Sequence, residues 1–131
     1  MQFYRLLFDS SEFCSELGKV TLASSQLEAE LIRLLTRKRV PQNVDGLTLG
    51  RLIRVAKKHG VLEPNVLSAL NEITGQRNYL THNIYALFIE LIEETRLERT
   101  NLLDSDVQTY IERAWELREN LLGLLAIVQD S

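Results

Sequence analysis

The stretch VQTYIERAWELRENLLGLLAIV, residues 107–128, has the clearest helical pattern in the chain. Its apolar residues recur every three or four positions, which places them along one face of an α-helix. They are Val107, Tyr110, Ile111, Ala114, Leu117, Leu121, Leu124, Leu125 and Val128. Ser105 or Asp106 is expected to cap this helix, whose length of about 24 residues corresponds to roughly 36 Å. A helix with so long an apolar face needs other helices to cover it.

The remainder of the chain is also rich in helix-forming residues and poor in residues that break helices. Only two prolines and six glycines occur among 131 residues, of which 45% are hydrophobic. We expect further helices over about 3–17, 20–37 and 49–58 and from Pro64 onward, with a loop at 40–46. Gly18 is expected to end the first of these, although Ser10 could start a new helix by capping. The sequence therefore predicts an all-α protein, a four-to-five-helix bundle with a long C-terminal helix, forming one domain over residues 1–131.

Several functional classes have no support in the sequence. Cys14 is the single cysteine, and no group of Cys and His residues has the spacing of a zinc site, so we expect neither a metal nor another cofactor. The first residues lack the apolar run of a signal peptide. The longest apolar run, Leu121 to Val128, is too short to cross a bilayer. We therefore expect a cytoplasmic protein without a membrane partner.

The net charge of −3 is unevenly distributed along the chain. Residues 33–59 contain eight basic side chains and one acid, whereas residues 90–119 contain nine acids and four arginines. The eight basic residues are Arg33, Arg37, Lys38, Arg39, Arg51, Arg54, Lys57 and Lys58. They are candidates for RNA binding through phosphate contacts. The alternatives are ordinary solvated helix faces, or contact between the basic region of one subunit and the acidic region of another.

One position in the predicted fourth helix does not fit a core pattern. Val66, Leu70, Ile73 and Leu80 follow helical spacing, and Arg77 occupies the core-facing position between the last two. A guanidinium stays charged at any accessible pH, so a largely buried Arg77 needs an acidic partner, a cleft or a subunit interface.

Arg77 belongs to the segment Arg77-Asn78-Tyr79-Leu80-Thr81-His82. An arginine can bind a phosphate through two parallel hydrogen bonds, and a histidine titrates near neutral pH and can transfer a proton. Five residues of helix separate Arg77 and His82 by about 140°. We therefore expect either a helix end near Thr81 or a two-fold dimer to bring them together. Asn78, four residues before His82, is placed to orient the imidazole.

The segment has an arginine, a polar residue, three further residues and a histidine, and it lies within a small helical domain. In this spacing and setting the chain resembles the HEPN superfamily (higher eukaryotes and prokaryotes nucleotide-binding domain). The segments around Leu27–Leu31, Leu47–Ile53 and Leu67–Ile73 follow the same family order. The resemblance covers about residues 16 to 90. It implies a homodimer and, in active members, a metal-independent endoribonuclease that acts in toxin–antitoxin, phage-defence or stress systems.

The resemblance also implies roles for individual residues. His82 would accept the proton of a ribose 2′-hydroxyl, Arg77 would stabilise the charged phosphorane, and Asn78 would position His82 or the phosphate. A toxin subgroup carries a modifiable tyrosine two residues after the histidine. Here Asn83 and Ile84 follow His82, so the candidate modification residue, Tyr85, is displaced by one position.

Structural interpretations stand beside these functional ones. Arg77 could pair with an acid, for which the candidates are Glu28, Glu30 and Glu72. In that case the chain would be a non-catalytic adaptor, antitoxin, immunity or regulatory subunit that binds a protein through the same surface. Tyr79 and Tyr85 are expected to pack, and Trp115 is expected to be partly buried.

Overall fold

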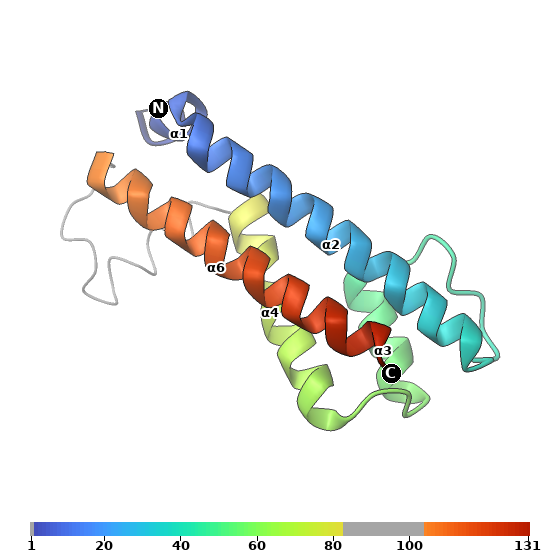
Figure 1. Ribbon diagram of the computed structural model, residues 1–131. Coiled ribbons are helices and arrows are strands. Elements are labelled where there is room, and N and C mark those ends of the chain that lie inside the picture. Colours follow the sequence, from blue (N-terminus) through green and yellow to red (C-terminus); the bar gives the residue numbers. More distant parts are fainter. Residues whose placement is uncertain (1, 83–103) are drawn as a thin grey trace.

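The computed structural model describes residues 2–82 and 104–131, and these residues form helices and connecting loops without a strand (Figure 1). The helices are α1 (Gln2–Asp9), α2 (Ser11–Arg37), α3 (Leu49–Lys58), α4 (Pro64–His82) and α6 (Asp104–Gln129). The predicted all-α class and the long C-terminal helix are confirmed. No helix in this part of the chain combines the length and apolarity that crossing a membrane requires.

The two longest helices, α2 and α6, lie side by side and run in the same direction (Figure 1). Helix α4 packs against both of them, and α3 packs against α2 and α4. Arg37 at the end of α2 donates a hydrogen bond to the main-chain oxygen of Ser131, just beyond α6. The frame of the fold is therefore a parallel pair of long helices with α4 packed across it.

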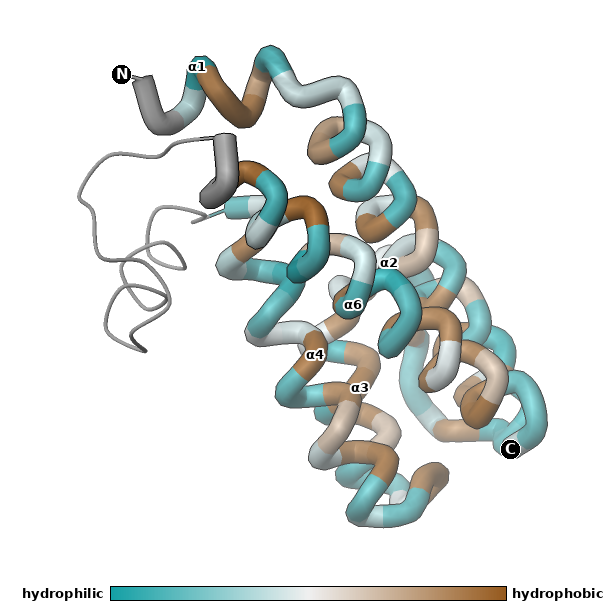
Figure 2. The backbone as a smooth tube through the Cα atoms, turned by 60° about the vertical axis from the view of Figure 1, so that its left-hand side comes forward, coloured by the Kyte–Doolittle hydropathy of each residue, from teal (hydrophilic) through white to brown (hydrophobic). Residues whose placement is uncertain are grey.

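Buried side chains come from the faces that the sequence predicts. All nine apolar residues of the α6 pattern are buried, as are the six expected on α2, namely Val20, Ala23, Leu27, Leu31, Leu34 and Leu35. Figure 2 shows apolar segments recurring along both helices between hydrophilic ones. On α4, Leu70, Ile73 and Leu80 are buried on the predicted face. Burial of these faces drives the association of the helices.

Gly18 does not end a helix, which corrects the expected boundary. Helix α2 runs through it from Ser11, after the one-residue break at Ser10. The Ser10 side chain accepts a hydrogen bond from the Phe13 amide at 3.1 Å, so the capping alternative is confirmed. Helix continuity prevails because the apolar face on both sides of Gly18 packs into the core, and this outweighs the weak helix propensity of one glycine.

Other boundaries agree with the prediction to within one or two residues. Helix α3 begins after Thr48, α4 begins at Pro64, and a loop occupies the expected segment at 40–46. Helix α6 includes Ser105 and Asp106, which were expected to cap it. Tyr79 is exposed and so packs less than expected, whereas Trp115, with about half of its surface in solvent, is partly buried as expected. Tyr85 lies outside the described residues.

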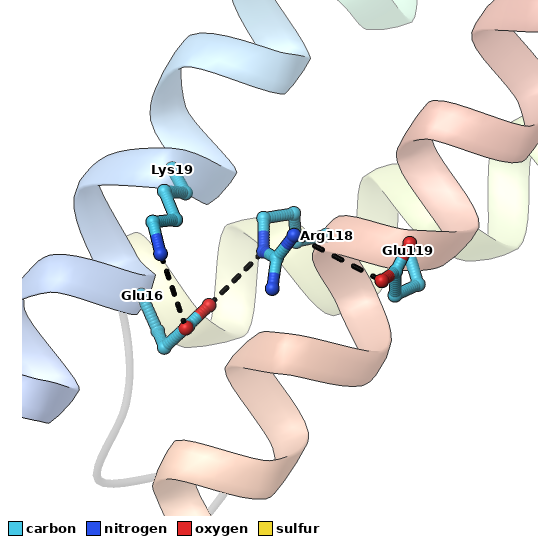
Figure 3. A network of polar contacts seen from close by, with 4 residues as sticks. All are labelled: Glu16, Lys19, Arg118 and Glu119. Carbon is cyan, nitrogen blue, oxygen red and sulfur yellow. Dashed lines mark hydrogen bonds and ion pairs between the residues drawn. The ribbon is translucent and has the colours of Figure 1, made fainter.

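A polar network joins α2 to α6 near the start of α2 (Figure 3). The Nε of Arg118 donates to a carboxylate oxygen of Glu16 at 3.0 Å. Lys19 lies 3.5 Å from the other oxygen of Glu16, and Glu119 lies 3.9 Å from Arg118. The Glu16–Arg118 pair therefore links the two long helices by a charge-assisted hydrogen bond.

Candidate functional site

A hollow of about 220 Å³ lies between α2 and α4 and contains the residues singled out in the sequence. Helix α4 contributes Arg77, Thr81 and His82, and helix α2 contributes Thr21, Ser24, Ser25 and Glu28. We call this space the Arg77–His82 hollow.

Arg77 and His82 border the hollow from one continuous helix. Helix α4 is described as far as His82, one residue beyond Thr81, and the segment that follows lies outside the described residues, so the expected helix end near Thr81 stays a prediction. A second subunit is unnecessary for the two residues to border one space. Helical rotation separates them, but a hollow between two packed helices can be bordered by more than one face of each. Arg77 is largely buried and His82 is exposed.

Asn78 holds Arg77 rather than His82. Its Oδ1 accepts hydrogen bonds from Nε and Nη2 of Arg77, at 3.2 and 2.8 Å. No hydrogen bond joins Asn78 to His82 among those of the described residues, so the expected orientation of the imidazole by Asn78 is absent. The reason is geometric, because the planar guanidinium presents two adjacent donors to a neighbouring carbonyl oxygen. Asn78 therefore fixes the direction of the guanidinium.

Glu28 is the acidic partner of Arg77. Its carboxylate oxygen lies 3.6 Å from Nη1 of Arg77, beyond the usual range of an N–H···O hydrogen bond. Coulomb attraction therefore accounts for this contact. Glu30, another of the three expected candidates, lies 3.2 Å from Arg33 on the same helix. Among the described residues, the Arg77 guanidinium thus has two polar side-chain partners, Asn78 by hydrogen bonds and Glu28 by a longer ion pair.

The side of the hollow formed by α2 is a polar stripe that sequence reasoning missed. Thr21, Ser24, Ser25 and Glu28 follow the spacing of one helix face, beside the apolar face of Val20 and Leu27. Ser24 is only 3% exposed, and its Oγ has no hydrogen-bond partner among the described residues. A buried unpaired hydroxyl costs about 1 to 3 kcal/mol. The one signal in the sequence is that Ser24 lies four residues after Val20 and three before Leu27, which is the spacing of the core face.

The eight basic candidates for RNA binding are all exposed, and none of them borders this hollow. Two have partners elsewhere, since Arg33 pairs with Glu30 and Arg37 donates to Ser131. Lys38 and Arg39 border a separate hollow of about 300 Å³ with His59. The structure therefore separates the basic residues from Arg77 and His82.

Among the described residues, no group of three or more His, Cys, Asp or Glu side chains could hold a metal ion. The charged groups of the hollow are an arginine and a glutamate, with one histidine. This set suits the binding of one anionic group and the transfer of one proton. Comparison with protein-family models, with curated proteins and with solved structures finds no match to the chain.

Proposed function

We propose that this chain is a metal-independent endoribonuclease of HEPN type. The observation that supports the proposal is that Arg77 and His82 border one hollow. Cleavage of a phosphodiester by a neighbouring ribose hydroxyl needs a proton acceptor for that hydroxyl and a cation for the phosphorane, and His82 and Arg77 would supply them.

In the proposed reaction, His82 accepts the proton of a ribose 2′-hydroxyl. The 2′-oxygen forms a bond to phosphorus, the bond from phosphorus to the 5′-oxygen breaks, and the leaving oxygen takes a proton from solvent. The products are a 2′,3′-cyclic phosphate and a 5′-hydroxyl. Arg77 stabilises the negative charge of the phosphorane. Asn78 acts as a positioning residue, since it holds the Arg77 guanidinium.

The test is cleavage of single-stranded RNA by the purified protein in the presence of a chelator. We expect 2′,3′-cyclic phosphate ends by mass spectrometry and no cleavage of a 2′-O-methyl analogue, in which the attacking hydroxyl is blocked. Loss of the base in His82→Ala should slow cleavage by about 10² to 10⁴. The matched control is His59→Ala, because His59 is the other histidine of the chain and lies outside this hollow.

Circular dichroism must show that each variant keeps the helical content of the parent. The proposal is wrong if His82→Ala cleaves as fast as the parent. It is also wrong if the folded parent leaves a broad set of single-stranded RNAs intact.

The same resemblance supports a homodimer that acts in the cytoplasm as a toxin or defence effector, restrained by a cognate antitoxin or regulatory protein. Sedimentation velocity tests the homodimer directly, because a monomer and a dimer of this 15.1 kDa chain separate clearly. RNA remains the proposed substrate, and the basic residues from Arg33 to Lys58 are proposed to attract it before it reaches the hollow.

A second candidate function is a non-catalytic adaptor, antitoxin or regulatory subunit. The observation that favours it is that Asn78 and Glu28 already neighbour the Arg77 guanidinium within the same chain. An adaptor predicts a stable complex with a protein partner and no RNA products. Arg77-dependent cleavage by the isolated protein would contradict it.

A further inference from the structure

A second hollow, of about 270 Å³, lies where α1 meets α2 and α4. Three aromatic side chains border it, namely Tyr4 and Phe8 from α1 and Phe13 from α2. Leu7, Leu17 and Leu80 make the rest of its surface mainly apolar. We call this space the aromatic hollow.

The aromatic side chains differ in their exposure. Phe13 is buried and contacts Tyr110 edge to face, with ring centroids 6.4 Å apart. Phe8 is 81% exposed, and Tyr4 is also exposed. The hollow therefore has a fixed aromatic floor and an exposed aromatic rim. Such a surface suits a flat apolar ligand that can stack on a ring face.

The aromatic hollow adjoins the Arg77–His82 hollow, because Thr81 borders both. On α2, Leu17 borders the first and Thr21 borders the second, and these residues are one helical turn apart, about 6 Å along the axis. Thr81 donates its hydroxyl hydrogen to the main-chain oxygen of Arg77 at 2.8 Å, which fixes the boundary between the two spaces. A flat apolar group and an anionic group of one ligand can therefore occupy neighbouring positions.

We infer that the aromatic hollow binds an unpaired nucleobase of the RNA strand whose phosphate occupies the Arg77–His82 hollow. The inference rests on the proposed ribonuclease function and deepens it by assigning a binding site for a base beside the site for the phosphate. A base in a duplex is stacked and paired, so it cannot enter, whereas an unpaired base can stack on an aromatic side chain. Stacking accepts any base, because every base has a π face.

The first experiment measures binding without cleavage. The probe is a fluorescein-labelled 2′-O-methyl oligouridylate octamer, and the reference is an abasic octamer with the same number of phosphates. In Phe8→Ala, fluorescence anisotropy should give at least fivefold weaker binding of the oligouridylate and unchanged binding of the abasic octamer. Because Phe8 is exposed, its truncation spares the core. The matched control is Trp115→Ala, an exposed aromatic residue outside the hollow, which should change neither affinity.

A second measurement uses the single cysteine of the chain. Cys14 is exposed and borders the aromatic hollow. A base in the hollow should slow alkylation of Cys14 by iodoacetamide, whereas the abasic octamer should leave the rate unchanged. This readout needs no substitution, so it holds even if Phe8→Ala folds poorly.

Equal binding of the oligouridylate by Phe8→Ala and the parent, with no protection of Cys14, overturns the inference. A changed sedimentation coefficient in Phe8→Ala with unchanged octamer binding also overturns it, because the hollow would then be a contact between copies of the chain. Phe8-dependent binding without any RNA cleavage keeps the base site and rejects the ribonuclease. Cleavage that is independent of Phe8 supports the ribonuclease and rejects the base site.

Discussion

Two arginines, Arg118 of α6 and Arg77 of α4, each pair with a glutamate of α2, yet the two contacts differ in kind. The arginine side chains are almost equally shielded, at 19% and 18% exposed. Arg118 donates a hydrogen bond to Glu16 at 3.0 Å, and Glu16 is 13% exposed. Arg77 lies 3.6 Å from Glu28, which is 32% exposed.

The surroundings explain the difference. Glu16 is held between Lys19 and Arg118, and Arg118 borders none of the hollows described above. The Arg77–Glu28 contact borders a hollow that also contains hydroxyls and a histidine. Burial of an arginine therefore does not reveal its role. The length of its ion pair and the space beside it distinguish an interhelical link from a candidate ligand site.

The largest expected effect separates the two arginines by activity. Arg77→Ala should reduce RNA cleavage by about 10² to 10³, because it removes charge stabilisation from the transition state. Arg118→Ala should keep cleavage within about threefold of the parent, since it removes only a contact between α2 and α6. Initial rates are compared at a temperature where both variants are folded. Equal losses of cleavage rate in the two variants would show that Arg77 has no catalytic role that Arg118 lacks.

The second effect is on the free energy of unfolding, and here Arg118→Ala should have the larger effect and Arg77→Ala the smaller. Arg118→Ala removes the shorter of the two contacts of the shielded Glu16 and leaves only Lys19 at 3.5 Å, so we expect a loss of about 2 kcal/mol in the free energy of unfolding. Arg77→Ala leaves Glu28 closer to solvent, and the expected loss is under about 1 kcal/mol. Urea denaturation followed by circular dichroism measures both values. A larger loss for Arg77→Ala would show that its pair with Glu28 is the structural one.

The third effect concerns the glutamates. Glu28→Gln removes a negative charge from the Arg77–His82 hollow and should tighten binding of the 2′-O-methyl octamer by about two- to fivefold. Glu16→Gln lies outside that hollow and should leave affinity unchanged while lowering stability. Anisotropy titrations at low salt compare the two, because salt screens the effect. Weaker binding by Glu28→Gln would mean that Glu28 helps to bind the ligand.

The smallest effect concerns the part of α2 that lies between the two ion pairs. Gly18→Ala should raise the free energy of unfolding by about 0.5 to 1 kcal/mol, since alanine favours a helix more than glycine does. A methyl group at Gly18 would meet no atom within 4 Å. Urea denaturation measures the gain. Destabilisation by this change would contradict a continuous α2 through Gly18.

Much of the fold was predictable because helical periodicity reports burial directly. The buried face of α6, the inward residues of α2 and the core-facing position of Arg77 all followed from spacing. The continuation of α2 through Gly18 was not predictable, because tertiary packing overrides the propensity of one residue. The expected partner of Asn78 was also wrong, because the neighbouring guanidinium offers it two donors.

The candidate site was predictable only on its α4 side. Arg77 and His82 stand out because their chemistry is unusual in an apolar pattern. Thr21, Ser24 and Ser25 do not, because hydroxyl residues on a helix are ordinarily exposed and unremarkable. Their importance depends on α4 packing against that particular face of α2, which is a property of the tertiary structure. The aromatic hollow was missed for the same reason, since it combines residues of three helices.

The joint at Ser10 has a consequence for how this chain could diversify. The Ser10 amide donates to the main-chain oxygen of Leu7 at 3.2 Å, and its side chain caps α2, so one residue satisfies both sides of the break. Helix α1 is thereby a separate helix of eight residues, joined to a helix that has its own N-terminal cap. Exchange of Tyr4 or Phe8 alters the rim of the aromatic hollow while α2 and α4 keep their own hydrogen bonds. If both proposals hold, the segment that contacts the base and the segments that carry Arg77 and His82 can therefore change independently.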